Sequence, residues 1–105
     1  MFEFLKKIFS RQASPSKNPP PDKKDLVGNV THYYGKAGAA VFKVKNGSLA
    51  IGDRIRVYGK HVDFEQTVET MEIDRKPIQK AAKGDEIGLG IRNKVHENDG
   101  IYRLG

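Results

Sequence analysis

The sequence contains no cysteine at any of its 105 positions. This absence excludes a disulfide framework and any cysteine-based metal site, and it favours a reducing compartment. No apolar run approaches the ~20 residues that span a bilayer. A secretory signal is not expected either, because Glu3, Lys6 and Lys7 interrupt the apolar N-terminus. We therefore expect a cytoplasmic protein, with any membrane contact peripheral.

Signatures of catalysis are also scarce. The Gly-Lys pairs at 35–36 and 59–60 lack the Ser or Thr that follows in a phosphate-binding loop, so no nucleotide is expected. Three histidines are scattered without the spacing of a metal site: His32, His61 and His96. Five carboxylates around the fourth expected strand are interpreted as a solvated acidic face: Asp63, Glu65, Glu69, Glu72 and Asp74. The sequence predicts a non-enzyme with no catalytic residues, no cofactor and no metal.

Proline and glycine divide the chain into two unlike parts. Four of the five prolines lie before residue 25, whereas all eleven glycines lie after it. The stretch 12–25 has no apolar residue larger than Ala13, so burial cannot repay the entropy of ordering it. We predict an amphipathic tail helix at 1–11, a proline-rich linker at 12–25 and one folded domain at 26–105.

The folded part alternates short apolar strands with glycine-containing turns. Strands are predicted at 26–34, 39–45, 54–59, 65–73, 86–92 and 100–104. Asn46-Gly47 is a hairpin turn signal, a bulge is expected near Glu69 or Thr70, and 77–84 suggests a helical turn. Gly88 and Gly90 would let another segment pack closely on their strand. The predicted fold is all-β, a small closed six-stranded antiparallel β-barrel with a disordered or helical N-terminal tail.

Three motifs follow one another in the order known from one family. They are NGSLAIGDRI from Asn46, VETMEIDRKPIQKA from Val68, and GDEIG from Gly84. In this respect residues 27–104 resemble the second, β-barrel domain of translation elongation factors. Gly52 and Gly84 are read as turn glycines, and the aspartates that follow them, Asp53 and Asp85, as caps of nearby backbone amides.

In elongation factors this barrel holds the aminoacylated end of tRNA, and Glu72 matches a glutamate that lies against the terminal adenosine. The first strand departs from the pattern at Gly28, Asn29 and Thr31, which removes an aromatic stacking surface. Glu86 replaces an asparagine and adds negative charge. The resemblance therefore predicts the barrel without its aminoacyl pocket.

Basic residues interleaved with an aromatic residue suggest a broader RNA-binding or partner-binding surface. Arg54, Arg56 and Tyr58 share the third strand, and further candidates come from other strands: Glu72, Arg92, Lys94 and Arg103. Contact with the ribosome or with another protein fits these charges as well as RNA does. The simplest alternative is that the outward positions of a barrel are charged.

The first eleven residues form an amphipathic pattern. At helical spacing one arc collects the apolar side chains Phe2, Phe4, Leu5, Ile8 and Phe9. So short a helix is unstable alone, so this segment is expected to dock. Its target is a membrane surface contacted by residues 2–11, the groove of a protein partner, or the barrel itself.

Three hypotheses for function follow. The first is a non-catalytic translation-factor-like barrel that binds RNA, the ribosome or a translation-associated protein. The alternative is an adaptor or accessory barrel held at a membrane surface or on a larger protein by its N-terminal helix, without a translation role. A third is that the barrel resembles the C-terminal accessory domain of certain peptidases, again without catalytic residues.

Overall fold

The computed structural model describes residues 19–104, and this part of the chain is all-β as predicted. A single turn of 3-10 helix, η3 (Lys23–Asp25), precedes ten strands. The strands are β2 (Leu26–Tyr34), β3 (Ala39–Lys43), β4 (Ser48–Ala50), β5 (Arg54–Tyr58), β6 (Asp63–Thr67), β7 (Met71–Ile73), β8 (Lys76–Pro77), β9 (Lys80–Ala82), β10 (Glu86–Gly90) and β11 (Gly100–Arg103). Over residues 19–104 no helix has the length and apolarity that crossing a bilayer requires. The expected tail helix, with its docking residues, lies outside the described residues.

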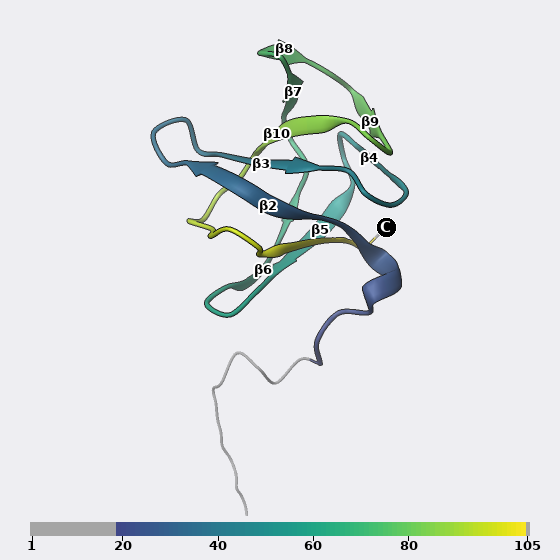
Figure 1. The fold of residues 1–105 in the computed structure, drawn as a ribbon, viewed down its shortest axis with the longest axis vertical. Coiled ribbons are helices and arrows are strands. Elements are labelled where there is room, and N and C mark those ends of the chain that lie inside the picture. Colours follow the sequence, from purple (N-terminus) through teal and green to yellow (C-terminus); the bar gives the residue numbers. More distant parts are fainter. Residues whose placement is uncertain (1–18, 105) are drawn as a thin grey trace, which may run out of the picture.

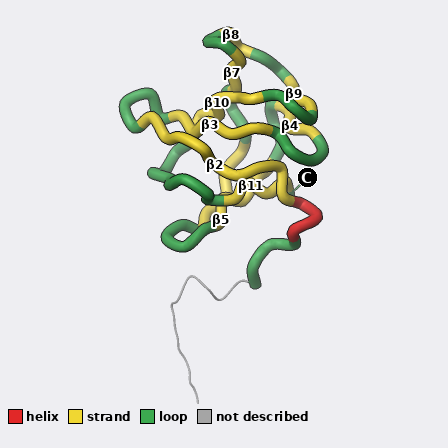
Figure 2. The backbone as a smooth tube through the Cα atoms, viewed as in Figure 1, coloured by secondary structure: helices red, strands yellow, loops and turns green. Residues whose placement is uncertain are grey.

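Eight strands form one curled antiparallel sheet in the order β6-β5-β11-β2-β3-β10-β7-β8 (Figures 1 and 2). Strands β4 and β9 pair in a second, two-stranded sheet. The end strands β6 and β8 do not pair with each other, so the predicted closed six-stranded barrel is wrong and the sheet is open. β8 is only two residues long and contains Pro77, which cannot donate a ladder hydrogen bond, so the sheet ends there.

The expected strand at 65–73 is broken into β6 and β7. β6 ends at Thr67, although the amide of Val68 still donates to the carbonyl of Asp53 at 2.8 Å, in line with the register of β5 and β6. Residues 68–70 then lead into β7, which pairs with β10 near the other end of the strand order. The helical turn expected at 77–84 is also wrong, because β8 and β9 occupy that stretch.

A buried glutamine bridges β6 to the end of β10. The side chain of Gln66 donates to the carbonyl of Gly90 and accepts from the amide of Arg92, each at 2.9 Å. Gln66 is 2% exposed, so these bonds satisfy the polar groups of its own buried side chain. A side chain therefore does here what strand pairing does elsewhere in the sheet.

The core lies inside the curl of the sheet. Inward residues alternate with outward ones along β3 and β10, and Ala40, Phe42 and Val44 are all buried. Sixteen apolar residues form one cluster: Val27, Val30, Ala40, Phe42, Val44, Leu49, Ile55, Val57, Val68, Met71, Ala81, Ile87, Leu89, Ile91, Val95 and Ile101. The outward residues of the same strands form the surface of the domain.

Two equivalent turns introduce β5 and β10. Gly52 and Gly84 both have φ of 98°, a conformation that favours glycine. The carboxylate of Asp53 accepts from the amide of Ala50, and that of Asp85 from the amide of Ala82, each at 2.9 Å. The predicted capping by both aspartates is therefore confirmed.

Candidate functional site

A groove of about 820 Å³ crosses the outer face of β3 and β10. It lies between the β2–β3 turn, which projects at the left of Figure 1, and the β7–β8 turn near the top. Its lining combines aromatic, small and charged residues: Tyr33, Tyr34, Gly35, Lys36, Ala37, Ala39, Val41, Glu72, Asp74, Arg75, Glu86, Ile87 and Gly88. We take this groove as the candidate site.

The floor of the groove is low because β10 has a glycine at an outward position. Val41 of β3 pairs with Gly88, and Gly88 pairs with Glu72 of β7, so the three form one row across the sheet. A methyl group placed on Gly88 would meet no atom within 4 Å. The close packing expected over both glycines of this strand is therefore wrong at Gly88. It is found at Gly90, where the Thr70 side chain lies against the glycine. Gly88 thus leaves an open notch between Val41 and Glu72.

One wall of the groove is aromatic. Tyr34 ends β2 and is 53% exposed, which makes it one of two large apolar residues exposed to this degree among residues 19–104. Its ring lies 4.3 Å from that of His32, and its neighbour Tyr33 packs against the core. An exposed tyrosine held by a packed neighbour offers contact area at low entropic cost.

The other wall carries charge. Glu72, Asp74 and Glu86 are exposed, and no ion pair joins them to another residue of the described part. The lining also includes Lys36 and Arg75, so it has one more acidic than basic side chain, although the whole chain carries a net charge of +6. Asp74 and Arg75 form the two-residue turn between β7 and β8 with φ of 51° and 66°, a type of turn in which Arg is unusual.

The arginines that sequence analysis proposed as phosphate contacts are instead each paired with a carboxylate. The pairs are Arg54 with Glu65 at 3.2 Å, Arg56 with Asp63 at 2.8 Å, Arg92 with Glu69 at 3.1 Å and Arg103 with Asp53 at 3.2 Å. Of the candidates, Lys94 is an exposed lysine in the loop after β10. A surface whose arginines are compensated in this way attracts phosphate weakly, because each contact must first displace a carboxylate.

Arg56 is the most enclosed of these arginines. Its guanidinium makes two 2.8 Å hydrogen bonds to Asp63, donates to the carbonyl of Pro19 at 2.9 Å and lies 5.1 Å from the ring centre of Tyr58. The hydrogen bond to Asp63 raises the pKa of Arg56 above its ordinary value, against the opposing effect of burial. The guanidinium of Arg56 is therefore held by contacts within the domain.

The predicted binding residues do not form one site. Arg54, Arg56 and Tyr58 lie on β5, and Arg103 lies on β11 beside it. Glu72 lies on β7, which four strands separate from β5 in the sheet order. Arg92 and Lys94 belong to the segment between β10 and β11. Only Glu72 belongs to the groove.

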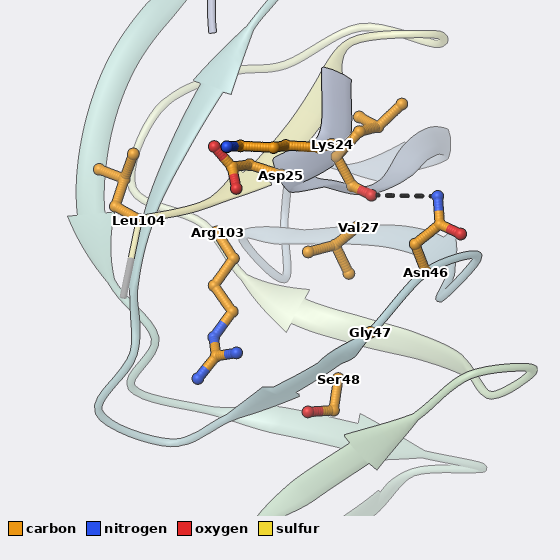
Figure 3. A pocket seen from close by; sticks show the side chains of 9 residues that line it. Lys24, Asp25, Val27, Asn46, Gly47, Ser48, Arg103 and Leu104 are labelled. Carbon is orange, nitrogen blue, oxygen red and sulfur yellow. Dashed lines mark hydrogen bonds between the residues drawn. The ribbon is translucent and has the colours of Figure 1, made fainter. Parts of the chain in front are cut away.

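A smaller pocket of about 300 Å³ lies where η3 and the end of β11 meet (Figure 3). Arg103 extends into it, and Asn46 donates to the carbonyl of Leu26 at its edge. The guanidinium of Arg103 is bound to Asp53, so this pocket offers no uncommitted arginine.

A further hollow of about 690 Å³ brings together two histidines that sequence analysis treated as unrelated. The rings of His61 and His96 lie 5.5 Å apart, and the buried Asp99 accepts from the amide of His96 at 2.7 Å. Within residues 19–104, no three His, Cys, Asp or Glu side chains are grouped as metal ligands. This pair therefore does not make a metal centre by itself.

Most groove residues were missed by sequence analysis. Tyr33, Tyr34, Lys36 and Arg75 were not predicted as site residues, because nothing in the sequence indicates that the two turns face each other. The available signal was Gly88, an outward glycine inside an otherwise regular strand, which indicates a close approach of some other group.

Comparison of the sequence with known proteins finds relatives that are named as proteases. The chain is 33% identical over 82 residues to a collagenase of Porphyromonas gingivalis, a match that covers 77% of this chain and 23% of the relative. It is 32% identical over 83 residues to an uncharacterised protease of Methanocaldococcus jannaschii, covering 78% of this chain and 20% of that protein. The chain thus spans about a fifth to a quarter of these relatives. No family model matches it.

Solved structures agree with this class. The C-terminal domain of a putative U32 peptidase from Geobacillus thermoleovorans has a TM-score of 0.72, with 13% identity, and the match covers 82% of this chain and 99% of that domain. Its selenomethionine variant has a TM-score of 0.68, with 15% identity, over 73% of this chain and 96% of that domain. These likenesses define the fold.

These findings overturn four predictions. The resemblance to the second domain of elongation factors is wrong, because the matched proteins are named as collagenase, protease and U32 peptidase. The two leading functions, a translation-factor-like barrel and a membrane or partner adaptor, are wrong for the same reason. The prediction of a non-enzyme is also wrong, since the relatives are named for enzymes. The third hypothesis, a likeness to the C-terminal domain of peptidases, agrees with these matches.

Proposed function

We propose that this chain acts as a domain of a peptidase-type protein and that its groove binds a segment of polypeptide. The observation that carries the proposal is the similarity of 77% of the chain to part of a collagenase. A collagenase acts on a protein, so polypeptide is the ligand class that this similarity suggests for the groove. A cytoplasmic location remains a prediction.

The shape of the groove supports this ligand. Its floor consists of strand backbone and small side chains at Ala39, Val41 and Gly88, and its aromatic wall is Tyr34. An extended polypeptide places side chains alternately up and down, so one side chain can enter the notch over Gly88 while its neighbours remain in water. Aromatic residues and backbone are the usual partners in such recognition.

Binding of unfolded polypeptide by the purified chain tests the proposal. Fluorescently labelled gelatin should bind in anisotropy titrations, and Gly88→Val should weaken binding at least about tenfold because valine fills the notch. Tyr34→Ala should weaken it by a smaller factor. Leu104→Ala is the matched control, since Leu104 is also a large exposed residue, at 47%, but lies outside the groove.

Two results would contradict the proposal. One is the absence of gelatin binding at millimolar concentration. The other is binding that Gly88→Val leaves unchanged while the thermal midpoint confirms that the variant is folded.

A further inference from the structure

We infer that the groove prefers polypeptide segments with a lysine or arginine, whose cationic end lies over Gly88 between Glu72 and Glu86. This inference rests on the proposed function and names the kind of segment that the groove would take. It depends on three features: the placement of the two carboxylates, their lack of ionic partners among residues 19–104, and the space over Gly88.

The two carboxylates lie on either side of the notch. Glu72 is directly opposite Gly88 on the neighbouring strand, and Glu86 is two residues before Gly88 on the same face of β10. Neighbouring strands are about 4.8 Å apart, and positions two residues apart on one face are separated by about 7 Å. One ammonium or guanidinium group over Gly88 is therefore within reach of both carboxylates.

The charges of the groove differ from those of the rest of the surface. On β5, β11 and the segment after β10, four arginines are paired with four carboxylates. Glu72 and Glu86 have no ion-pair partner in the described part of the chain. A cation from a ligand would supply the missing charge, whereas an anion would be repelled.

The surrounding basic residues determine how much each of the two carboxylates contributes to the preference for a cationic side chain. Lys43 lies opposite Glu86 in the register of β3 and β10, so it partly offsets the charge of Glu86. Lys36 and Arg75 stand on the two turns at the rim. Glu72 therefore carries the larger part of the preference.

The floor also suits the stem of a basic side chain. Lys and Arg carry three or four methylene groups that pack on apolar surface while the charged end stays solvated. Val41 borders the notch on the side away from Glu72. A stem lying on Val41 points its charged end at Glu72.

Three peptides that differ only at one central residue test the inference. They carry Lys, Gln or Glu in an otherwise neutral extended sequence, and binding is measured by anisotropy at low salt with the full chain. The Lys peptide should bind about fivefold tighter than the Gln peptide, as expected for an exposed ion pair. The Glu peptide should bind more weakly than either, and salt should reduce these differences.

Substitutions assign the preference to the groove. The double variant Glu72→Gln with Glu86→Gln should bind all three peptides equally while its affinity for the Gln peptide stays the same. Glu97→Gln, at an exposed carboxylate outside the groove, should keep the full preference.

The outcomes separate this inference from the proposed function. Equal binding of the three peptides by the parent chain overturns the preference alone, provided that Gly88→Val abolishes that binding. No binding of any peptide overturns both. Tighter binding of the Glu peptide, or of an oligouridylate in place of a peptide, overturns the preference and indicates an anionic ligand.

Discussion

Strands β5 and β10 begin with the same turn, but their outward sides form different surfaces. Residues 52–57 and 84–89 each start with Gly-Asp in the same turn, and each continues with inward apolar residues two positions apart. Their partners correspond as well, since Ile55 pairs with Gln66 and Ile87 pairs with Phe42. The amides of Gly52 and Gly84 donate at 2.8 Å to the carbonyls of Val68 and Val44, which follow those partner strands.

The outward positions of the two strands differ. On β5 the outward Arg56 is buried beneath Asp63 and Pro19. The equivalent position on β10 is Gly88, over which the groove stays open. The comparison teaches that the repeated backbone determines where a surface lies, while one outward residue determines whether that surface is covered or available.

The largest expected effect concerns the inward partners of the two strands. Gln66 occupies the position that corresponds to Phe42, but it bridges β6 to the end of β10. Gln66→Leu should lower the free energy of unfolding by about 3 to 5 kcal/mol, because both hydrogen bonds of the bridge are lost and the part-buried carbonyl of Gly90 and amide of Arg92 are left without this partner. Urea unfolding measures this loss. Gln79→Leu, at an exposed glutamine, should cost little, and equal stability of the two variants would show that the bridge is unnecessary.

A somewhat smaller loss is expected when the cover over β5 is removed. Asp63→Ala leaves the guanidinium of Arg56 largely buried without its partner, which should cost about 2 to 4 kcal/mol. The thermal midpoint should fall by roughly 10 to 20 °C. Glu65→Ala is the control, because it breaks the half-exposed pair with Arg54 and should cost less than about 1 kcal/mol. A fall no greater than that of the control would mean that Asp63 does not hold Arg56.

The smallest effects should have opposite signs on β10. Gly88→Ala should raise the free energy of unfolding by about 0.5 kcal/mol, because the methyl group has open space and the unfolded chain loses freedom. Gly90→Ala should lower it by about 1 kcal/mol, because the methyl group would press on the Thr70 side chain. Calorimetry of both variants measures the two changes. Equal changes would contradict the open notch at Gly88.

The parts of this fold that could be predicted depend on residues close together in sequence. Gly52 and Gly84 adopt the positive φ that turns require, and the aspartates after them cap amides three residues away. Apolar and polar residues alternate along 39–45, and this local pattern matches the buried face of β3. The break after Thr67 was only partly visible, as an interruption of alternation, because it depends on a change of partner strand from β5 to β10.

The candidate site could not be predicted in the same way. The basic residues on β5 were recognised as outward, but a sequence does not show that each arginine meets a carboxylate on β6. Arg54 lies opposite Thr67 but bonds to Glu65, and Arg56 lies opposite Glu65 but bonds to Asp63. In each case the carboxylate is two positions earlier on β6 than the residue opposite the arginine. Such diagonal contacts depend on register and on the reach of the side chains.

The sequence by itself determined the all-β class, the turn glycines and the inward faces of the long strands, because strand period and positive φ are local requirements. Only the tertiary structure decided that the sheet stays open and that Gln66 bridges β6 to the end of β10. It also decided that the β2–β3 and β7–β8 turns flank Gly88. These features arise from contacts between residues far apart in the chain, and such contacts depend on the pairing order of strands, which local patterns do not specify.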